Sequence, residues 1–195
     1  MHNTKADVKR TKKKYDKALN SIVQVPHKSL SKKLNHISPS KAQTGVMKTT
    51  IKKLKAVLDQ IGYGLGIAAN QLGLHQRVFL IDLSKVPESE TKGKFFSKIP
   101  NSSYAVFISA RITPTVDQEY YETVEACLSL ATRAFLVMRT KEVIVRYVGL
   151  DGKTHRIEAD GLLAQILQHE IDHTNGFTIK DIAHKELLNV EDKVE

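Results

Sequence analysis

The segment His169-Glu170-Ile171-Asp172-His173 constrains the fold of this chain more than any other. Two histidines four residues apart lie on one face of an α-helix, so both imidazoles can reach one divalent metal ion. The intervening Glu170 points to the same side and can accept a proton from water held by that metal. Residues 162–167 are mostly apolar, and burying these polar groups without a metal would be costly. The sequence therefore predicts a metal-binding helix in the core.

Two histidines need a third protein ligand if one position on the metal is to stay open. Among downstream residues, His184, Glu186 and Glu191 lack the spacing of the extended zinc-protease motifs. Cys127 is the better candidate, because a thiolate with two imidazoles suits zinc or ferrous iron. A lone cysteine is ordinarily a small buried hydrophobe, and only the histidine motif favours the ligand interpretation here.

Charge is concentrated in the first part of the chain. Residues 1–55 hold 15 of the 30 Lys and Arg but only two of the 21 acidic residues. Such an imbalance favours a polyanionic partner, although a solvated basic tail is the simpler interpretation. The single cysteine, and the absence of an apolar leader or of a long apolar run, predict a reducing compartment and no membrane span. We expect a cytoplasmic protein, with an organellar stroma or matrix as the alternative.

The periodicity of apolar residues predicts an α+β fold in which short antiparallel strands pack around the central helix. A chain of 195 residues favours one domain, and we expect a basic extension over 1–20, a metal-dependent domain over 21–182 and a short tail over 183–195. The expected helices cover residues 47–61 and 159–173, and the expected strands cover residues 21–25, 78–81, 104–108, 141–148 and 155–158. Residues 84–103 show little periodicity and are expected to form a surface insertion.

Three ordered segments together resemble the peptide deformylases, over roughly residues 20–182. They are Gly64-Leu65-Gly66-Ile67-Ala68-Ala69-Asn70-Gln71, Glu125-Ala126-Cys127-Leu128-Ser129 and Gln168-His169-Glu170-Ile171-Asp172-His173. The matching family motifs are G-x-G-x-A-A-x-Q, E-G-C-L-S and Q-H-E-x-D-H. Three motifs in order are far more specific than any one of them. The resemblance implies the peptide deformylase fold and the removal of the formyl group from N-formylmethionyl peptides.

The resemblance also implies a role for each matching residue. Cys127, His169 and His173 would bind Fe²⁺, for which Zn²⁺ or Ni²⁺ can substitute, and Glu170 would move the proton. Gln71 and the backbone N–H of Leu128 would stabilise the oxyanion. The residues expected to bind the substrate are Gly64, Leu65, Gly66, Ile67, Glu125, Gln165 and Ile166.

Two departures from the family pattern leave a weakened or altered deformylase as an alternative. Ala126 replaces a glycine, which matters only if that position needs a positive φ or a close substrate approach. Gln165 stands where the family has an apolar residue near the methionine pocket. A metalloprotease shares the helix motif but ordinarily uses a histidine or carboxylate as third ligand.

The basic residues suggest a further partner, the ribosome. We expect a monomer whose Lys and Arg in residues 5–17, together with the lysine face at 48–55, give salt-sensitive ribosome association. The non-enzymatic alternative is a metal-stabilised module that only binds ribosomal RNA, for which Glu170 and Gln71 would not be needed.

Overall fold

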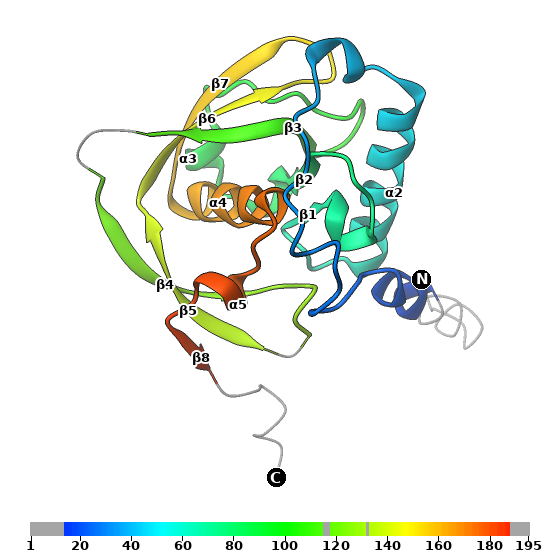
Figure 1. Cartoon of the computed structure of the whole chain (residues 1–195). Helices are drawn as coiled ribbons and strands as arrows, with labels where there is room; N and C mark the ends of the chain where they lie inside the picture. Colours follow the sequence, from blue (N-terminus) through cyan, green and yellow to red (C-terminus); the bar gives the residue numbers. More distant parts are fainter. Residues whose placement is uncertain (1–13, 115–117, 132, 188–195) are drawn as a thin grey trace, which may run out of the picture.

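A computed structural model describes residues 14–114, 118–131 and 133–187 (Figure 1). The helical elements are η1 (Pro39–Lys41), α2 (Gly45–Ile61), η2 (Ala69–Leu72), η3 (Leu83–Lys85), α3 (Glu88–Thr91), α4 (Gly161–Asn175) and α5 (Ile179–Ile182), and residues 14–20 are also helical. The strands are β1 (Gly66–Ala68), β2 (Val78–Asp82), β3 (Tyr104–Thr113), β4 (Tyr120–Ala126), β5 (Ala134–Thr140), β6 (Glu142–Val148), β7 (Thr154–Asp160) and β8 (Lys185–Leu187). The mixture of helices and antiparallel strands confirms the expected α+β class.

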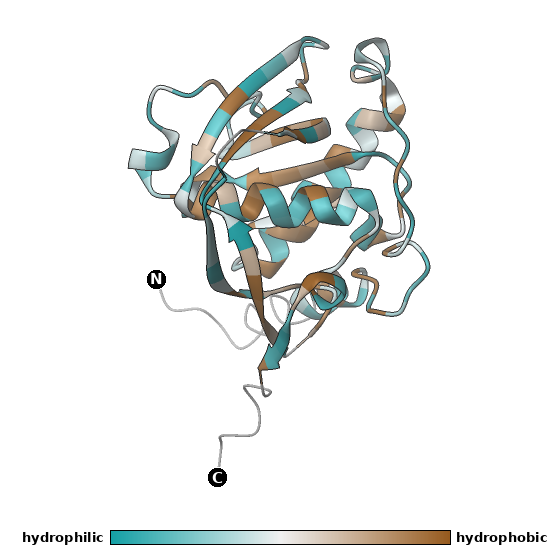
Figure 2. Ribbon diagram, turned by 60° about the vertical axis from the view of Figure 1, so that its left-hand side comes forward, coloured by the Kyte–Doolittle hydropathy of each residue, from teal (hydrophilic) through white to brown (hydrophobic). Residues whose placement is uncertain are grey.

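A five-stranded antiparallel sheet, in the order β1-β2-β3-β6-β7, lies between α2 and α4. Strand β2 is buried throughout because both of its faces are covered. Phe79 and Ile81 pack in the cluster that contains α4, whereas Val78 and Leu80 pack in the cluster that contains α2. The hydropathy colouring follows this arrangement, with hydrophobic segments along the strands and the inward face of α4 (Figure 2). The two-sided core leaves β1 at an edge of the sheet, beside α4.

Helix α2 has the predicted amphipathic pattern and well-defined ends. The side chain of Thr44 accepts a hydrogen bond from the Met47 N–H at its start. At its end, Gly62 adopts φ 79° and donates its N–H to the Leu58 carbonyl, a left-handed cap that glycine permits without strain. The lysines Lys48, Lys52 and Lys53 lie on the exposed face.

Helix α4 starts two residues later than predicted, because residues 159–160 belong to β7. Its first turn is capped from α3, where the Glu90 carboxylate accepts the Leu163 N–H at 2.7 Å. It ends at Gly176, whose φ is 87° and where a Cβ would lie 2.7 Å from the Lys33 nitrogen. These two ends fix the position of the histidine motif along the sheet.

Residues 84–103 are not the simple surface insertion that the sequence predicts. Val86 and Phe96 are buried in the α4 core cluster. The segment also supplies α3, whose Glu90 caps α4, so it is part of the framework around the site. Its lack of periodicity reflects short elements rather than exposure.

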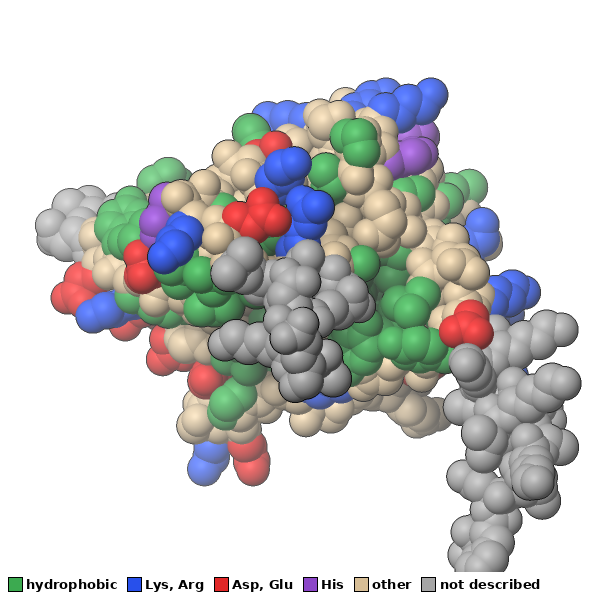
Figure 3. Space-filling view, turned by 90° about the horizontal axis from the view of Figure 1, so that it is seen from below, with side chains coloured by type: hydrophobic (Ala, Val, Ile, Leu, Met, Phe, Trp, Pro, Cys, Tyr) green, Lys and Arg blue, Asp and Glu red, His purple; other side chains and the backbone are tan. Residues whose placement is uncertain are grey.

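A second sheet, in the order β4-β5-β8, consists of three strands, none of which the sequence predicted. Tyr120, Val124 and Met138 are more than half exposed on it, so its strands show no simple apolar alternation. Viewed from below, the face that carries this sheet gathers hydrophobic side chains (Figure 3).

The predicted strand at residues 21–25 is wrong. This segment has no regular secondary structure. The Val23 N–H donates to the Gln71 carbonyl and the Val25 N–H donates to the Ser129 carbonyl, and neither bond belongs to a β-sheet.

No helix in the described part of the chain is long and apolar enough to cross a membrane. The boundaries predicted at residues 20 and 182 stay predictions, and residues 1–13 and 188–195 lie outside the described ranges.

Candidate metal centre and active site

One thiol and two imidazoles converge between the two sheets. Cys127 follows the last residue of β4 and is 6% exposed, while His169 and His173 lie one turn apart on α4. One ligand atom from each of the three residues lies within 4.8 Å of the others. The thiol and the His173 Nε2 are 3.2 Å apart. The residues of the predicted ligand set therefore form a possible metal site.

The ionisation of Cys127 and His169 fits this donor set. Burial opposes ionisation of the Cys127 thiol, but His173 and His169 outweigh it and lower the pKa of the thiol to about 5. Burial also opposes protonation of His169, yet its hydrogen bonds with Cys127 and Glu125 raise its pKa well above the ordinary value. A thiolate is the form that binds metals, so the surroundings of Cys127 favour its ligand state.

A buried ionic network orients the first histidine. The Glu125 carboxylate accepts from His169 Nδ1 at 2.8 Å, which leaves the Nε2 of His169 facing the thiol. Arg139 on β5 donates to both oxygens of Glu125, at 2.7 and 2.9 Å, and to Asp172 at 2.6 Å. Burial opposes the ionisation of Glu125, but the bonds with Arg139 and His169 prevail and lower its pKa to about 2. Glu125, predicted as a substrate-binding residue, thus has its carboxylate occupied by protein groups.

Glu170 is a buried carboxyl group that faces the edge strand β1. Its Oε2 has no hydrogen-bond partner among the described residues. A Cβ added at Gly66 would lie 2.6 Å from its Oε1, so the carboxyl group sits directly against the β1 backbone. Burial raises the pKa of Glu170 to about 7, and the nearby histidines oppose this rise. A carboxyl group with a pKa near neutrality can both accept and donate a proton.

Gln71 closes the opposite side of the thiol. Its Nε2 donates to Ser129 Oγ at 3.3 Å and lies 3.7 Å from the sulfur of Cys127, and its Oε1 accepts from Ala68 N at 2.9 Å. These bonds hold the amide group in place with its N–H₂ beside the ligand cluster. Leu128, whose N–H is the second predicted oxyanion donor, follows Cys127 directly and lines the same cavity.

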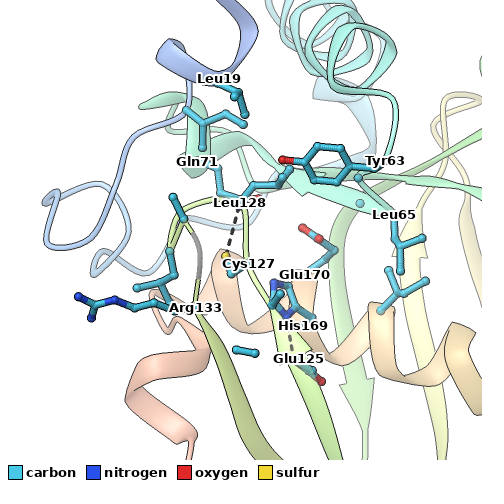
Figure 4. A pocket seen from close by; sticks show the side chains of 18 of the residues that line it. Leu19, Tyr63, Leu65, Gln71, Glu125, Cys127, Leu128, Arg133, His169 and Glu170 are labelled. Atoms are coloured by element: carbon cyan, nitrogen blue, oxygen red, sulfur yellow. Dashed lines mark hydrogen bonds and ion pairs between the residues drawn. The ribbon is translucent and has the colours of Figure 1, made fainter. Parts of the chain in front are cut away.

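A cavity of about 1120 Å³ opens in front of these residues (Figure 4). Its lining includes the predicted substrate-binding residues Gly64, Leu65, Gly66, Glu125, Gln165 and Ile166. Ile67 is different, because its side chain is fully buried in the α2 cluster. Any contact between Ile67 and a ligand would therefore use its backbone on the edge strand.

Ala126 occupies an ordinary extended conformation. It is the last residue of β4 and pairs with Ala134 of β5. Asn101 and Ser109 are the only non-glycine residues with positive φ in the described ranges, so Ala126 has no backbone strain. Its methyl group lines the cavity without a conformational cost.

Arg139 and several cavity residues were missed from the sequence. Arg139 lies on β5, a strand whose pattern was not recognised. Asp172 on α4 pairs with this arginine. Tyr15, Leu19 and Tyr63 also line the cavity, and no motif pointed to them.

Known proteins with similar sequences and structures identify the family. A family model described as polypeptide deformylase matches residues 19–187. A peptide deformylase of Agrobacterium fabrum is 40% identical over 119 residues, which are 60% of this chain and 62% of that protein. One of Bradyrhizobium diazoefficiens is 34% identical over 176 residues, which are 86% of this chain and 89% of that protein.

The solved structures agree in fold. The crystal structure of peptide deformylase from Ehrlichia chaffeensis matches with a TM-score of 0.66 and 30% identity, covering 84% of this chain and 88% of that one. The chain spans less than two thirds of the length of several curated relatives that it matches. With the family model matching most of its length, the chain belongs to the polypeptide deformylase family.

Proposed function

We propose that this chain hydrolyses the formyl group of N-formylmethionyl peptides and releases formate. One observation carries the proposal: the thiol, both imidazoles and the buried carboxyl group of Glu170 meet at one end of a cavity bordered by an edge strand. The family acts on formylated nascent peptides, which agrees with this arrangement.

The residues present fit a divalent metal. Cys127, His169 and His173 offer one sulfur and two nitrogen ligands. The lowered pKa of the Cys127 thiol favours the thiolate, whose negative charge stabilises a bound cation. We propose Fe²⁺, as the resemblance to the family implies, with Zn²⁺ or Ni²⁺ as substitutes that accept the same donor set. When bound, the ion supplies a Lewis acid that acidifies water and polarises the formyl oxygen.

Glu170 would carry the proton. Its pKa near 7 lets it take a proton from the attacking water and deliver it to the leaving amine nitrogen as the C–N bond breaks. The amide of Gln71 and the N–H of Leu128 would donate to the oxygen on which negative charge develops. Both donors belong to segments that the protein already holds in place, so little reorganisation is needed.

The edge strand β1 would bind the peptide backbone. Its outer edge has no strand partner among the described residues, since β1 pairs with β2 alone. An extended peptide could add to this edge as a further strand. The absence of a side chain at Gly66 keeps the approach to Glu170 open.

The test is formate release by anaerobically purified full-length chain, with metal analysis of the same sample. We expect one metal ion per chain and turnover of formyl-Met-Ala-Ser. Glu170→Gln should keep the metal and lose turnover by about 10²- to 10⁴-fold, because it removes the proton carrier. Glu142→Gln, an exposed position on β6, is the matched control and should retain activity.

Stoichiometric metal without formate release would contradict the proposal and favour the weakened or binding-only alternatives. Cleavage of internal peptide bonds would favour the metalloprotease. No bound metal would overturn the ligand assignment itself. We further propose that the chain is a monomer that works in the cytoplasm.

A further inference from the structure

The helical residues 14–20 form part of the wall of the active-site cavity. Tyr15, Leu19 and Asn20 line the same cavity as Cys127 and Glu170. In Figure 4, Leu19 lies at the side of Gln71 and Leu128, across the cavity from Glu125. Residues far apart in the sequence thus border the region into which a bound peptide would extend.

This wall is anchored in the protein. Ala18 and Ile22 are 2% and 4% exposed and pack in the α2 cluster. The Ser21 hydroxyl donates to the Ala18 carbonyl, and the Val23 N–H donates to the Gln71 carbonyl at 2.8 Å. The wall therefore has a fixed position relative to the predicted oxyanion donor.

Tyr63, which follows the Gly62 cap of α2, continues this wall. Its side chain is 59% exposed, and Figure 4 shows its ring over the cavity. Burial, and after it the neighbouring phenol of Tyr15, raise the pKa of Tyr63, and both side chains line the same cavity, so two aromatic side chains from distant segments form one surface. Leu19 and Leu128 supply apolar surface beside them.

A peptide that adds to β1 in the antiparallel direction would run from Gly66 toward this surface. Glu170 marks the reacting end at Gly66, and a Cβ on Gly64 would lie 3.4 Å from Leu128. Tyr63 immediately precedes Gly64. Each extended residue advances about 3.3 Å, so a peptide that starts at the reacting end passes this surface within its next two residues.

We propose that Tyr15, Leu19 and Tyr63 form a subsite that binds apolar side chains at the second and third residues of the formylated peptide. This inference rests on the proposed function, because that function places the formyl group of the peptide at Cys127, His169 and His173. The subsite would make the chain selective for the residues that follow methionine, with apolar residues preferred over small polar ones. The helical residues 14–20 are then part of the binding cleft and not only a basic extension.

The experiment compares formyl-Met-Leu-Phe with formyl-Met-Ser-Ser on the full-length protein. We expect the wild type to favour the apolar peptide by about tenfold in kcat/KM, mainly through KM. Tyr15→Ala and Tyr63→Ala should each reduce that preference by about three- to tenfold, because they remove apolar surface. Tyr15→Phe and Tyr63→Phe keep the rings and should keep most of the preference.

Tyr120→Ala is the matched control, since Tyr120 is 58% exposed and lies outside the cavity lining. It should leave the preference unchanged. Equal preference in the wild type and in both Ala variants would overturn the proposal, as would a wild type that treats the two peptides alike.

Binding of the product peptides Met-Leu-Phe and Met-Ser-Ser, measured by calorimetry, separates this inference from the proposed function. Tighter binding of Met-Leu-Phe that both Ala variants weaken would support the subsite even if the protein released no formate. Equal Kd values for the two peptides would overturn the subsite even if the protein were an active deformylase.

Discussion

Arg139 is the residue on which the buried charges of the site depend. It donates to both oxygens of Glu125 and to Asp172, and its own side chain is 5% exposed. Glu125 in turn accepts from His169, so the arginine acts on a proposed ligand through one intermediate carboxylate. A buried carboxylate whose cationic partner is removed keeps its desolvation cost without compensation.

We therefore expect Arg139→Met to lower the free energy of unfolding by roughly 3 kcal/mol. It should also weaken metal retention, because His169 loses its fixed orientation. Urea unfolding and the metal content after dialysis measure the two effects. Arg156→Met removes an exposed ion pair with Glu158 and should change stability by less than about 1 kcal/mol. Equal losses in the two variants would contradict a special role for Arg139.

Gly66 is the glycine that leaves room for Glu170. A Cβ at this position would lie 2.6 Å from the Glu170 Oε1 and 3.0 Å from its carboxyl carbon. Gly66→Ala should displace the carboxyl group and reduce kcat/KM for formyl-Met-Ala-Ser by about 10²-fold, while the metal stays bound. Gly45→Ala is the control, since a Cβ there meets nothing within 4 Å. Full activity of Gly66→Ala would show that Glu170 does not need its observed position.

At the scale of elements, the junction after β2 carries an acid-sensitive contact. The Oδ1 of Asp82 accepts from the hydroxyls of Ser84 and Ser103 at 2.7 and 2.6 Å, and Lys85 lies 3.3 Å from Oδ2. Burial opposes the ionisation of Asp82, but these hydrogen bonds outweigh it and lower its pKa below the ordinary 3.8. The folded protein therefore binds fewer protons than the unfolded chain in this range, and stability rises with pH there.

Asp82→Asn should consequently cost about 2 kcal/mol in free energy of unfolding near pH 6. The difference between wild type and variant should shrink as the pH falls below the unfolded value of about 3.9 and through the lower folded pKa of Asp82. Urea unfolding of both proteins at several pH values measures this difference, in which contributions from other groups cancel. A difference that does not change between pH 6 and 3 would contradict the assignment.

Helices and strands were predictable from the sequence where their apolar residues follow one clear pattern. Helix α2 and the histidine helix have strong 3.6-residue periodicity, and β2 and β3 are apolar on both faces because both faces are covered. Strands β4 and β5 were missed because Tyr120, Val124 and Met138 are exposed and break the alternation. Residues 21–25 satisfy strand composition, yet their N–H groups bond to Gln71 and Ser129 instead of a neighbouring strand.

The residues of the candidate site were also predictable only where a local sequence pattern marks them. Local spacing and motif order predicted Cys127, His169 and His173, which the structure brings together. Arg139 depends on the register of β4 with β5, and the Tyr15–Tyr63 contact depends on tertiary packing. Contacts of this kind form between residues that are distant in the sequence, so the spacing of residues along the chain does not predict them.

At the scale of the whole molecule, the basic face of α2 predicts salt-sensitive ribosome association. Lys48, Lys52 and Lys53 are exposed there, while the basic residues within 5–13 lie outside the described ranges. A variant with these three lysines changed to glutamate should co-sediment with ribosomes less than wild type at low salt, because fewer counterions are released on binding. The exposed lysines Lys92, Lys98 and Lys153 provide a control with the same charge change. Equal losses in both variants would indicate net charge rather than the α2 face.

The third ligand and the two histidines come from different layers of the molecule. Cys127 extends from the three-stranded sheet, whereas the histidines belong to the helix under the five-stranded sheet. An ion held by all three would act as a cross-link between the layers, and its binding energy would add to the stability of the folded chain. Cells short of the metal would then hold a less stable form that proteases remove faster, so the abundance of the protein would follow metal supply.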